Sequence, residues 1–479
     1  MFTRNYLLVF LVLLVLFIAV FAPIVYTGYA DLRSAQSAAA QSKFSEAAQK
    51  YESAARRLFW RNDLWEQAGL SAYRAQSMNE AIRLLEIARQ KNSLSDKGWY
   101  ALGLAYWTNK DHKTALSIWQ AGAKLDPNYA PMYDRLSIAY HENGDYVSEQ
   151  AALTKRLALA DDASAHYRLG LLLTLSDPDQ SIQELLAASS LEPQFDSAVQ
   201  TLRAALNIAA LKSAPSERFT ITGRGLGLVN EWGLASKAFE SAVSADGENA
   251  EAWAWLGEAR QQTGDALRPK GVSKGQDGSE DLNQALSLAP RDPLVRGLRG
   301  LYFKRQGNYV AALNEYLQAA QIEPDNPAWQ VSIGEAYTQS GNLVAALAAY
   351  QKATALAQND ATYWRLLAMF CSDNGVQVSD IGLPAAQKAA GISPNDPQVL
   401  DALGWSFMNA GYLSHAEETL LKAEKAAPDS AIIHVHLAEM YLQRGDKLSA
   451  LKELNLAQGL DFGGALGQFA GKLLQQYFP

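Results

Sequence analysis

The sequence has little cysteine and no excess of positive charge. Only one cysteine, Cys371, occurs in 479 residues, which excludes an internal disulfide framework and a multi-thiolate metal site within a single chain. The formal net charge is −8, whereas a nucleic-acid-binding protein usually shows a basic face. We therefore expect no nucleic-acid partner. The hydrophobic share of 48% is sufficient for a large buried core.

No short signature of a common catalytic site occurs in the context that its chemistry needs. The zinc-protease pattern His-Glu-x-x-His does not occur, because His141 and Glu142 are followed by Asn143-Gly144-Asp145. Gly-x4-Gly-Lys-Ser/Thr is not present. Gly-x-Ser-x-Gly occurs as Gly271-Val272-Ser273-Lys274-Gly275, but within a stretch that we expect to be a solvent loop and not the strand-to-helix turn that this motif needs. The run Gly223-Arg224-Gly225-Leu226-Gly227 looks like a phosphate loop, but no strand precedes it. Small-residue packing inside a helix is the favoured interpretation of that run.

His434, His436 and Cys371 are the remaining candidates for chemistry. Residues two apart on a helix point to different faces, so we expect ordinary helix-face histidines rather than a metal pair. Cys371 occupies an inward position of the repeat described below, and we expect an inert core thiol there. The sequence thus predicts no catalytic residue, no cofactor, no metal and no small-molecule substrate. We expect that the chain is not an enzyme.

Charged residues are almost missing from the N-terminal segment. Leu7 to Val25 consists of Leu, Val, Phe and Ile apart from Ala19, Ala22 and Pro23. Nineteen helical residues at 1.5 Å each span roughly 28 Å, about the thickness of the hydrocarbon core of a bilayer. The apolar core of a cleavable signal peptide is shorter, about 7–15 residues. We therefore predict a retained transmembrane signal-anchor, with membrane contact through residues 6–26.

Two features of this segment leave alternatives open. Gly28-Tyr29-Ala30 could serve as a small-x-small cleavage site, and cleavage after Ala30 would give a secreted, soluble binding protein. Arg4 precedes the span, while Asp31 and Arg33 follow it closely. The positive-inside rule then favours a cytoplasmic N-terminus, with the rest of the chain outside the cytoplasm.

A pair of amphipathic helices is predicted for residues 96–129. One quartet of residues at spacing i, i+3, i+4, i+7 is followed by a second quartet, and each falls on one helix face. Glycine is unfavourable inside a helix, so Gly103 and Gly122 indicate close packing. Pro127 has no backbone N–H and stops the second helix. The two quartets are Trp99, Leu102, Gly103, Tyr106 and Ala115, Ile118, Trp119, Gly122.

The same spacing returns about every 34 residues. The repeating units are 28–61, 62–95, 96–129, 130–163, 164–195, 216–249, 250–292, 293–326, 327–360, 361–396, 397–430 and 431–464. The first unit has a degenerate opening helix, and Glu149 stands where the other units have a small residue. An unpaired helix is expected at 196–212 and a capping helix at Ala465–Phe478. We expect a solvent loop at Asp265–Gly278 and an enlarged turn at Gly375–Pro384.

The pattern Trp-x2-Leu-Gly-x2-Tyr, then Ala-x3-aromatic, then Pro resembles the tetratricopeptide repeat (TPR). Seven residues occupy its places, namely Trp99, Leu102, Gly103, Tyr106, Ala115, Trp119 and Pro127. The resemblance implies an all-α fold, a right-handed superhelical solenoid of about twelve helix pairs preceded by one transmembrane helix. We predict an anchor at 1–27, an N-terminal TPR block at 28–212, a C-terminal TPR block at 213–464 and a capping helix at 465–479.

The resemblance also implies a concave groove lined by the first helix of each pair. In this family the groove positions lie at offsets −2, +1, +5, +8 and +9 from the place of Trp99. The predicted partner-binding residues are Glu66, Tyr73, Arg74, Lys97, Tyr100, Leu104, Trp107, Asp134, His141, Lys304, Arg305, Arg365 and Trp405. We expect Tyr73 to stand beside Trp107 as part of an aromatic anchor for a peptide. An equally open interpretation is that Trp107 packs as additional core.

The predicted function is a membrane-tethered scaffold for protein–protein interaction, with a protein or peptide partner in the groove. The alternative is a regulatory or assembly subunit of a cell-envelope enzyme complex, or an enzyme with an unrecognised site. No segment outside the repeats exceeds about forty residues, which is too short for an independent catalytic domain.

Overall fold

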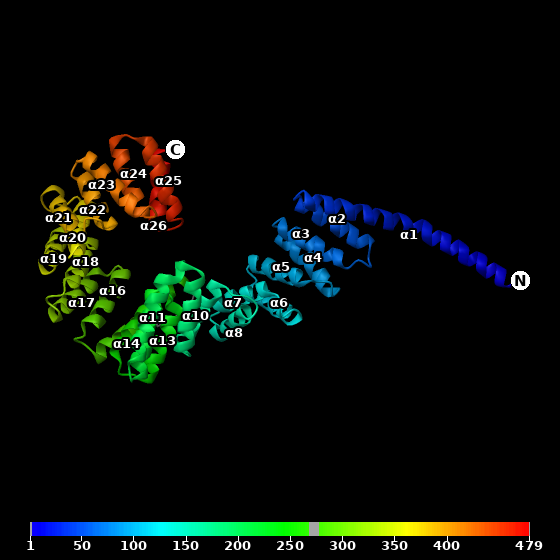
Figure 1. Ribbon diagram of the computed structural model, residues 1–479, viewed down its shortest axis with the longest axis horizontal. Coiled ribbons are helices and arrows are strands. Elements are labelled where there is room, and N and C mark those ends of the chain that lie inside the picture. Colours follow the sequence, from blue (N-terminus) through cyan, green and yellow to red (C-terminus); the bar gives the residue numbers. More distant parts are fainter. Residues whose placement is uncertain (1, 268–276, 479) are drawn as a thin grey trace. The chain divides into compact units, whose positions relative to one another are not determined.

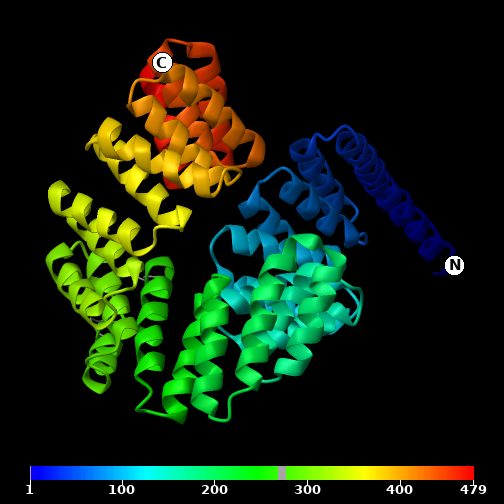
Figure 2. The ribbon, with the colours of Figure 1, turned by 60° about the vertical axis from the view of Figure 1, so that its left-hand side comes forward.

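The protein is described by a computed structural model that covers residues 2–267 and 277–478. Within these residues all regular structure is helical and there is no strand. The 26 α-helices follow one another as twelve sequential pairs, with α11 and α26 left single (Figures 1 and 2). The predicted all-α array of about twelve helix pairs is confirmed.

Two compact units can be separated. The first consists of residues 1–211 with 228–234, and the second of residues 212–227 with 235–479. The predicted division into blocks at residues 212 and 213 stays a prediction. In order along the chain, the first twelve helices are α1 (Phe2–Ala40), α2 (Phe44–Arg57), α3 (Asp63–Arg74), α4 (Met78–Gln90), α5 (Asp96–Thr108), α6 (His112–Leu125), α7 (Ala130–Glu142), α8 (Tyr146–Leu157), α9 (Ala163–Leu173), α10 (Pro178–Leu191), α11 (Asp196–Ala210) and α12 (Pro215–Leu228).

The other helices continue the same alternation of first and second helices. They are α13 (Trp232–Ala245), α14 (Ala250–Leu267), α15 (Ser279–Leu288), α16 (Pro293–Arg305), α17 (Tyr309–Ile322), α18 (Pro327–Gln339), α19 (Leu343–Leu356), α20 (Ala361–Asn374), α21 (Leu383–Ile392), α22 (Pro397–Asn409), α23 (Leu413–Ala426), α24 (Ala431–Arg444), α25 (Lys447–Leu460) and α26 (Ala465–Tyr477). Most first helices begin at the first residue of a predicted unit or within one residue of it.

Helix pairs close because a glycine on the first helix admits a large side chain from the second. A Cβ atom at Gly103 would overlap the indole of Trp119, which is itself buried. The Gly223 position would place a Cβ 2.6 Å from Cε1 of Phe239. The glycine-rich run 223–227 therefore lies inside α12 and serves packing, as the sequence indicated.

Turns within the pairs recur with the same chemistry. Gly341 adopts a φ of +79°, a conformation that glycine adopts without steric cost. Asn342 then caps α19, because its side-chain oxygen accepts a hydrogen bond from the N–H of Ala345 at 3.2 Å. Asp111 and Thr114 form the equivalent cap of α6 at 3.1 Å.

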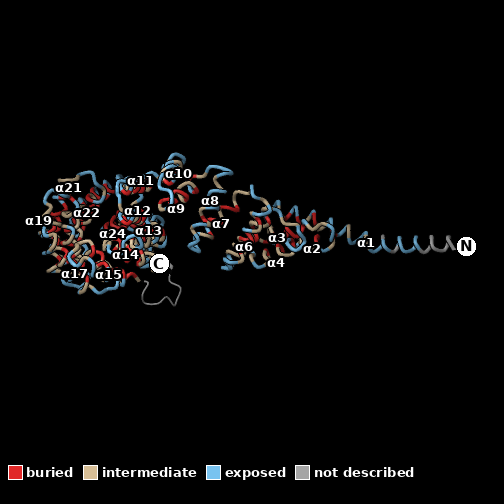
Figure 3. Tube along the Cα trace, turned by 90° about the horizontal axis from the view of Figure 1, so that it is seen from below, coloured by how far each residue is buried: buried red, intermediate tan, exposed pale blue. Residues whose placement is uncertain are grey.

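The predicted membrane span and the degenerate opening helix of the first repeat form a single N-terminal helix. α1 is one unbroken helix of 39 residues that contains Pro23. Its C-terminal part buries Leu32, Ala35 and Ala38 in the core that it shares with α2. Its N-terminal part is exposed and projects beyond the helix pairs of the first unit (Figures 1 and 3). The boundary predicted at residue 27 therefore lies inside a continuous helix.

α1 is long and apolar enough to cross a membrane. Its described segment Phe10–Ala40 has a mean hydropathy of 2.7 in its most apolar window, and none of that window is buried. Such a helix is consistent with an anchor by length and composition.

Two loop predictions need adjustment. The loop expected from Asp265 begins later, because α14 continues to Leu267. Residues 268–276 lie outside the described part of the chain. The enlarged turn after Gly375 contains a short π-helical segment, Val378–Gly382, before α21 begins.

Candidate partner-binding face

Three successive first helices of the first unit place polar aromatic and cationic side chains side by side. Tyr73 comes from α3, Tyr100 from α5 and Arg135 from α7. We call these three residues the tyrosine–arginine row. The Nε of Arg135 donates a hydrogen bond to the hydroxyl of Tyr100 at 3.1 Å, and its guanidinium lies 5.8 Å from the centre of the Tyr100 ring. The Tyr100–Arg135 contact thus connects two consecutive repeats, and Tyr73 belongs to the repeat before them.

Electrostatics agree with this placement of Tyr73. Burial raises the pKa of Tyr73, the neighbouring Tyr100 raises it further, and Arg135 partly opposes both effects. All three side chains are half-buried. A second ring, that of Tyr129, meets Tyr100 edge-on with the centroids 6.1 Å apart.

Trp107 makes its ring contacts within its own repeat, as one of the two interpretations of the sequence expected. Its ring stacks on His112 at 3.9 Å and touches Trp119 at 5.5 Å between centroids. Both contacts are made within its own helix pair, at the edge of the core that Leu104 also joins. These contacts favour the interpretation of Trp107 as additional core, and the expected position of Tyr73 beside Trp107 stays a prediction.

Two acidic groove positions of the first unit already hold structural hydrogen bonds, Glu66 between repeats and Asp134 within one. Glu66 is buried and accepts hydrogen bonds from the N–H of Ser95 at 2.8 Å and from its hydroxyl at 2.5 Å. Asp134 accepts from Nε of Arg156 at 2.6 Å. A carboxylate engaged in this way is a weak candidate for partner recognition, because a ligand would have to displace its present donor.

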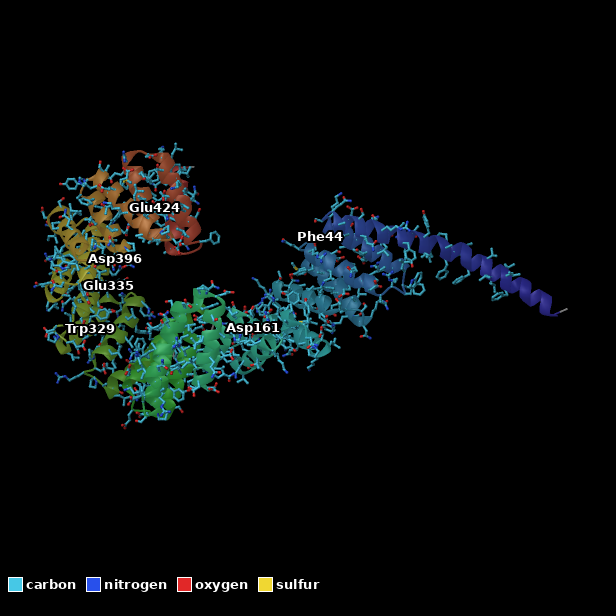
Figure 4. All side chains as sticks on the ribbon, viewed as in Figure 1. Phe44, Asp161, Trp329, Glu335, Asp396 and Glu424 are labelled. Carbon is cyan, nitrogen blue, oxygen red and sulfur yellow. The ribbon has the colours of Figure 1, made fainter. Side chains whose placement is uncertain are left out.

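The remaining groove positions of this unit have varied environments. The guanidinium of Arg74 lies 5.7 Å from the ring centre of Phe44, which is labelled in Figure 4. His141 is exposed, and its Nδ1 lies 2.7 Å from Arg168. Lys97 is exposed on α5.

Basic groove positions of the second unit are mostly neutralised by neighbouring repeats. Lys304 pairs with Glu335 at 2.7 Å, and Arg305 grips both carboxylate oxygens of Glu258 at 2.6 and 2.7 Å. Arg365 is half-buried and lines a shallow hollow in front of α20 and α22. Within residues 2–267 and 277–478, it has no ion pair.

Trp405 belongs to a hydrogen-bonded cluster on α20, α22 and α24. Its Nε1 donates to Asp373 at 2.7 Å, and its ring stacks on His436 with centroids 4.1 Å apart. Nδ1 of His436 in turn lies 2.8 Å from a carboxylate oxygen of Asp401. The tryptophan is therefore held in place by its neighbours.

Comparisons with known families agree with this repeat geometry. A family described as "Tetratricopeptide repeat" matches residues 66–130. Another, described as "Cilia and flagella-associated protein 70 C-terminal domain", matches residues 282–470. The chain is a tetratricopeptide repeat protein. No curated protein matches it.

Several solved structures are similar to this TPR protein at low sequence identity. The crystal structure of yeast Tom70 has a TM-score of 0.42 and 15% identity, covering 86% of this chain and 96% of Tom70. The Cut9–Hcn1 hetero-tetramer of the APC/C has a TM-score of 0.42 and 15% identity, covering 93% and 95%. PilF of Pseudomonas aeruginosa has a TM-score of 0.37 and 17% identity, covering 47% and 97%.

Sequence reasoning missed one position of the TPR face. Arg135 and His436 both lie two residues after the place of Trp99 in their units, an offset outside the five that we used. This offset precedes offset +5 by three residues and +9 by seven, so all three share a helix face. A bulky polar residue at that place in two units was the available signal.

The departure at Glu149 also has a structural explanation in this TPR protein. Glu149 is buried, and Arg168 donates to its two oxygens at 2.5 and 3.2 Å. Arg168 also donates to Glu231 at 2.9 Å. Burial works to raise the pKa of Glu149, but the hydrogen bonds from His141 and Arg168 outweigh it and lower that pKa. An ion pair replaces the usual small residue here.

One group of side chains has the composition of a metal site. Ligand atoms of Glu424, His434 and Glu453 lie within 4.8 Å of one another, and Glu424 is labelled in Figure 4. Yet both ring nitrogens of His434 already face acceptors, Glu453 at 2.6 Å and the carbonyl of Pro428 at 2.8 Å. Hydrogen bonding to Glu453, aided by the carbonyl, raises the pKa of His434. The arrangement fits a charged histidine that bridges α24 and α25.

Proposed function

We propose that this TPR protein is a membrane-tethered scaffold that captures a protein or peptide segment on the face of its first helices. TPR arrays in general serve as interaction scaffolds. The tyrosine–arginine row supports this function most directly, since Tyr73, Tyr100 and Arg135 come from three consecutive repeats and remain partly exposed. Tyrosine and arginine are the residue types enriched among interface hot spots.

The membrane part of the proposal rests on α1. Its apolar segment continues without a break into the first repeat, so the array would begin at the membrane surface. We propose that the N-terminus is cytoplasmic and the repeats are extracytoplasmic, following the weak bias of Arg4.

Crosslinking and affinity capture from detergent-solubilised membranes tests the binding face. We expect a Tyr100→Ala, Arg135→Ala double variant to lose a crosslinked partner that the wild type retains, because a hot spot contributes about 2 kcal/mol or more. Tyr412→Ala is the matched control, since Tyr412 is exposed at the start of α23 and lies outside the row. Equal capture by the double variant and the control would refute the assignment of the row.

A further inference from the structure

An exposed aromatic pair stands in the turn between α2 and α3. Phe59 is 62% exposed and Trp60 is 46% exposed, and their rings meet edge-on with centroids 5.0 Å apart. Two adjacent large aromatic side chains in a turn add little to the repeat core. Such a patch commonly marks an interaction site.

The turn lies at a defined height along α1. Leu58, the residue before the aromatic pair, packs directly on Gly28, where a Cβ atom would lie 2.8 Å from its side chain. Gly28 follows Val25, the end of the apolar run, by three residues, or about 4.5 Å along a helix. The headgroup region of a bilayer is about 5–8 Å thick on each side. If α1 crosses a membrane, the turn is therefore at the level of the headgroups.

Other aromatic residues gather at the same level. Tyr26 and Tyr29 follow the apolar run on α1, and Tyr26 is 77% exposed. Trp60 faces a hollow on α1 that Phe21, Val25 and Tyr29 also line. Tyrosine and tryptophan are enriched at membrane–water interfaces because one end of each ring is apolar and the other polar. Here that belt comes from two separate segments of the chain.

The charges around this belt are compatible with lipid headgroups. Asp31 is the first acidic residue after the span, and it is neutralised by Arg57 and by Lys50 at 3.6 Å. Arg33 is exposed one turn beyond Tyr29. The exposed Arg33 would attract anionic headgroups, and the neutralised Asp31 would repel them little.

We propose that Phe59 and Trp60 insert into the headgroup region of the bilayer that α1 crosses. The proposal rests on the membrane anchor proposed above. Its consequence is that the first helix pair is docked on the membrane surface at two points, α1 and the Phe59–Trp60 turn. A partner would then be presented to the array from the membrane side at a defined height.

Site-directed labelling of the full-length protein tests this docking. The native Cys371 is fully buried, and burial raises its pKa to about 11, so an added surface cysteine would be labelled selectively. Trp60→Cys carries an environment-sensitive NBD group, and Phe59→Cys serves as a second probe. Val147→Cys is the control, because Val147 is 82% exposed on α8 of the same unit. Each variant is reconstituted into phosphatidylcholine–phosphatidylglycerol vesicles with and without doxyl-labelled lipid.

We expect doxyl lipid to remove most of the NBD emission at positions 59 and 60 and little of it at position 147. Carbonate extraction of the same vesicles reports separately on α1. Carbonate-resistant protein whose labels at 59 and 60 are quenched no more than the control would overturn the docking and leave the anchor intact. Labels shielded from aqueous iodide but unquenched by lipid would show a protein partner or a second copy on the turn, which also overturns it. Full extraction by carbonate would refute both the anchor and the docking.

Discussion

In five of the repeats, one side chain bonds back to the turn before its helix. At the place of Trp99, residues in several units bond to the carbonyl oxygen six positions upstream, although their chemistry differs. The donors and carbonyls are Tyr133 to Pro127 at 3.2 Å, Trp253 to Gly247 at 2.9 Å, Arg296 to Pro290 at 3.0 Å, Trp364 to Gln358 at 2.9 Å and His434 with Pro428 at 2.8 Å. This bond satisfies a carbonyl of the turn, two residues past the end of the preceding helix. What these residues share is a hydrogen-bond donor at the end of a long side chain, and tryptophan is one of several residue types that supply it.

His434 and Glu453 form a pair whose contribution to stability depends on pH. The pKa of His434 is raised from its usual 6.5, so its contribution to stability is complete below 6.5 and is lost as pH rises through the higher folded value. Burial works to raise the pKa of Glu453, but hydrogen bonds from His434 and Lys452 lower it below 4.5. Its contribution is complete above 4.5 and is lost as pH falls through the lower folded value.

We therefore predict that the last helix pair is most protected between about pH 4.5 and 6.5 and loosens as the pH rises beyond. Hydrogen exchange of α24 and α25, corrected for the intrinsic pH dependence, measures this. A His434→Gln variant keeps a donor for the Pro428 carbonyl but removes the titration. An identical pH dependence in wild type and variant would contradict the assignment.

Gly103 provides a test of close packing. Gly103→Leu would drive a side chain into the buried indole of Trp119, and overpacking of this kind costs about 1–3 kcal/mol. Because repeats contact only their neighbours, we expect hydrogen exchange to rise first in residues 62–163. A uniform rise along the whole chain would be inconsistent with nearest-neighbour coupling. Gly391→Leu is the control, since nothing surrounds that position within 4 Å.

At the scale of the helix, the predicted groove positions recur at the same offsets on each first helix, but they serve two different roles. Some are used in contacts between repeats, as Glu66 shows by binding the backbone and hydroxyl of Ser95. Others, such as Tyr100, remain partly exposed on the face. Offset along the helix gives the direction of a side chain, but its partner comes from the next helix pair.

Trp107 and Tyr100 should consequently respond differently to truncation. We expect Trp107→Ala to lower the thermal midpoint, because its stacking on His112 and Trp119 would be lost. Full burial would make a Trp→Ala change cost about 3–5 kcal/mol, and half-burial reduces this to roughly half.

Tyr100→Ala should keep its midpoint within a few degrees of wild type while weakening partner capture. Calorimetry and the crosslinking assay, run on both variants, separate the two roles. A stable Trp107→Ala variant that fails to capture the partner would show that Trp107 belongs to the binding surface.

At the scale of the whole molecule, the proposed membrane location of the array depends on the apolar end of α1. The run Leu7–Val25 holds sixteen Leu, Val, Phe or Ile residues, each favouring insertion by roughly 0.3–0.6 kcal/mol near the centre of a span. The sum exceeds the cost of Pro23. We predict that full-length protein stays in the pellet after carbonate extraction, and immunoblotting of both fractions measures it.

A Leu13→Arg, Leu14→Arg variant is the control for this prediction. Each arginine near the centre of a span costs about 2.5–3.5 kcal/mol of insertion. It should move protein to the soluble fraction without changing the repeats. Wild-type protein in the supernatant would end the anchor hypothesis, and an N-terminal sequence starting at Asp31 would show cleavage after Ala30.

Local periodicity in the sequence was enough to predict the helix pairs. Spacing of i, i+3, i+4 and i+7 is a property of a single helix. Residues such as Gly103, Trp119 and Pro127 therefore predict a helix pair even when the neighbouring pairs are not known. The same logic placed the unpaired α11 and the capping α26. The anchor boundary at residue 27 stays a prediction, because periodicity does not indicate where a membrane surface would lie along α1, which is continuous through Pro23.

Partners of charged and aromatic side chains were decided by the tertiary structure. Arg305 binds Glu258, Arg168 binds Glu149 and Arg135 binds Tyr100. In each case the two residues belong to different helix pairs. Periodicity specifies the direction in which a side chain leaves its own helix. The free energy of an ion pair or ring contact depends on which group the adjacent repeat places within a few ångströms, and only stacking of the repeats sets that distance.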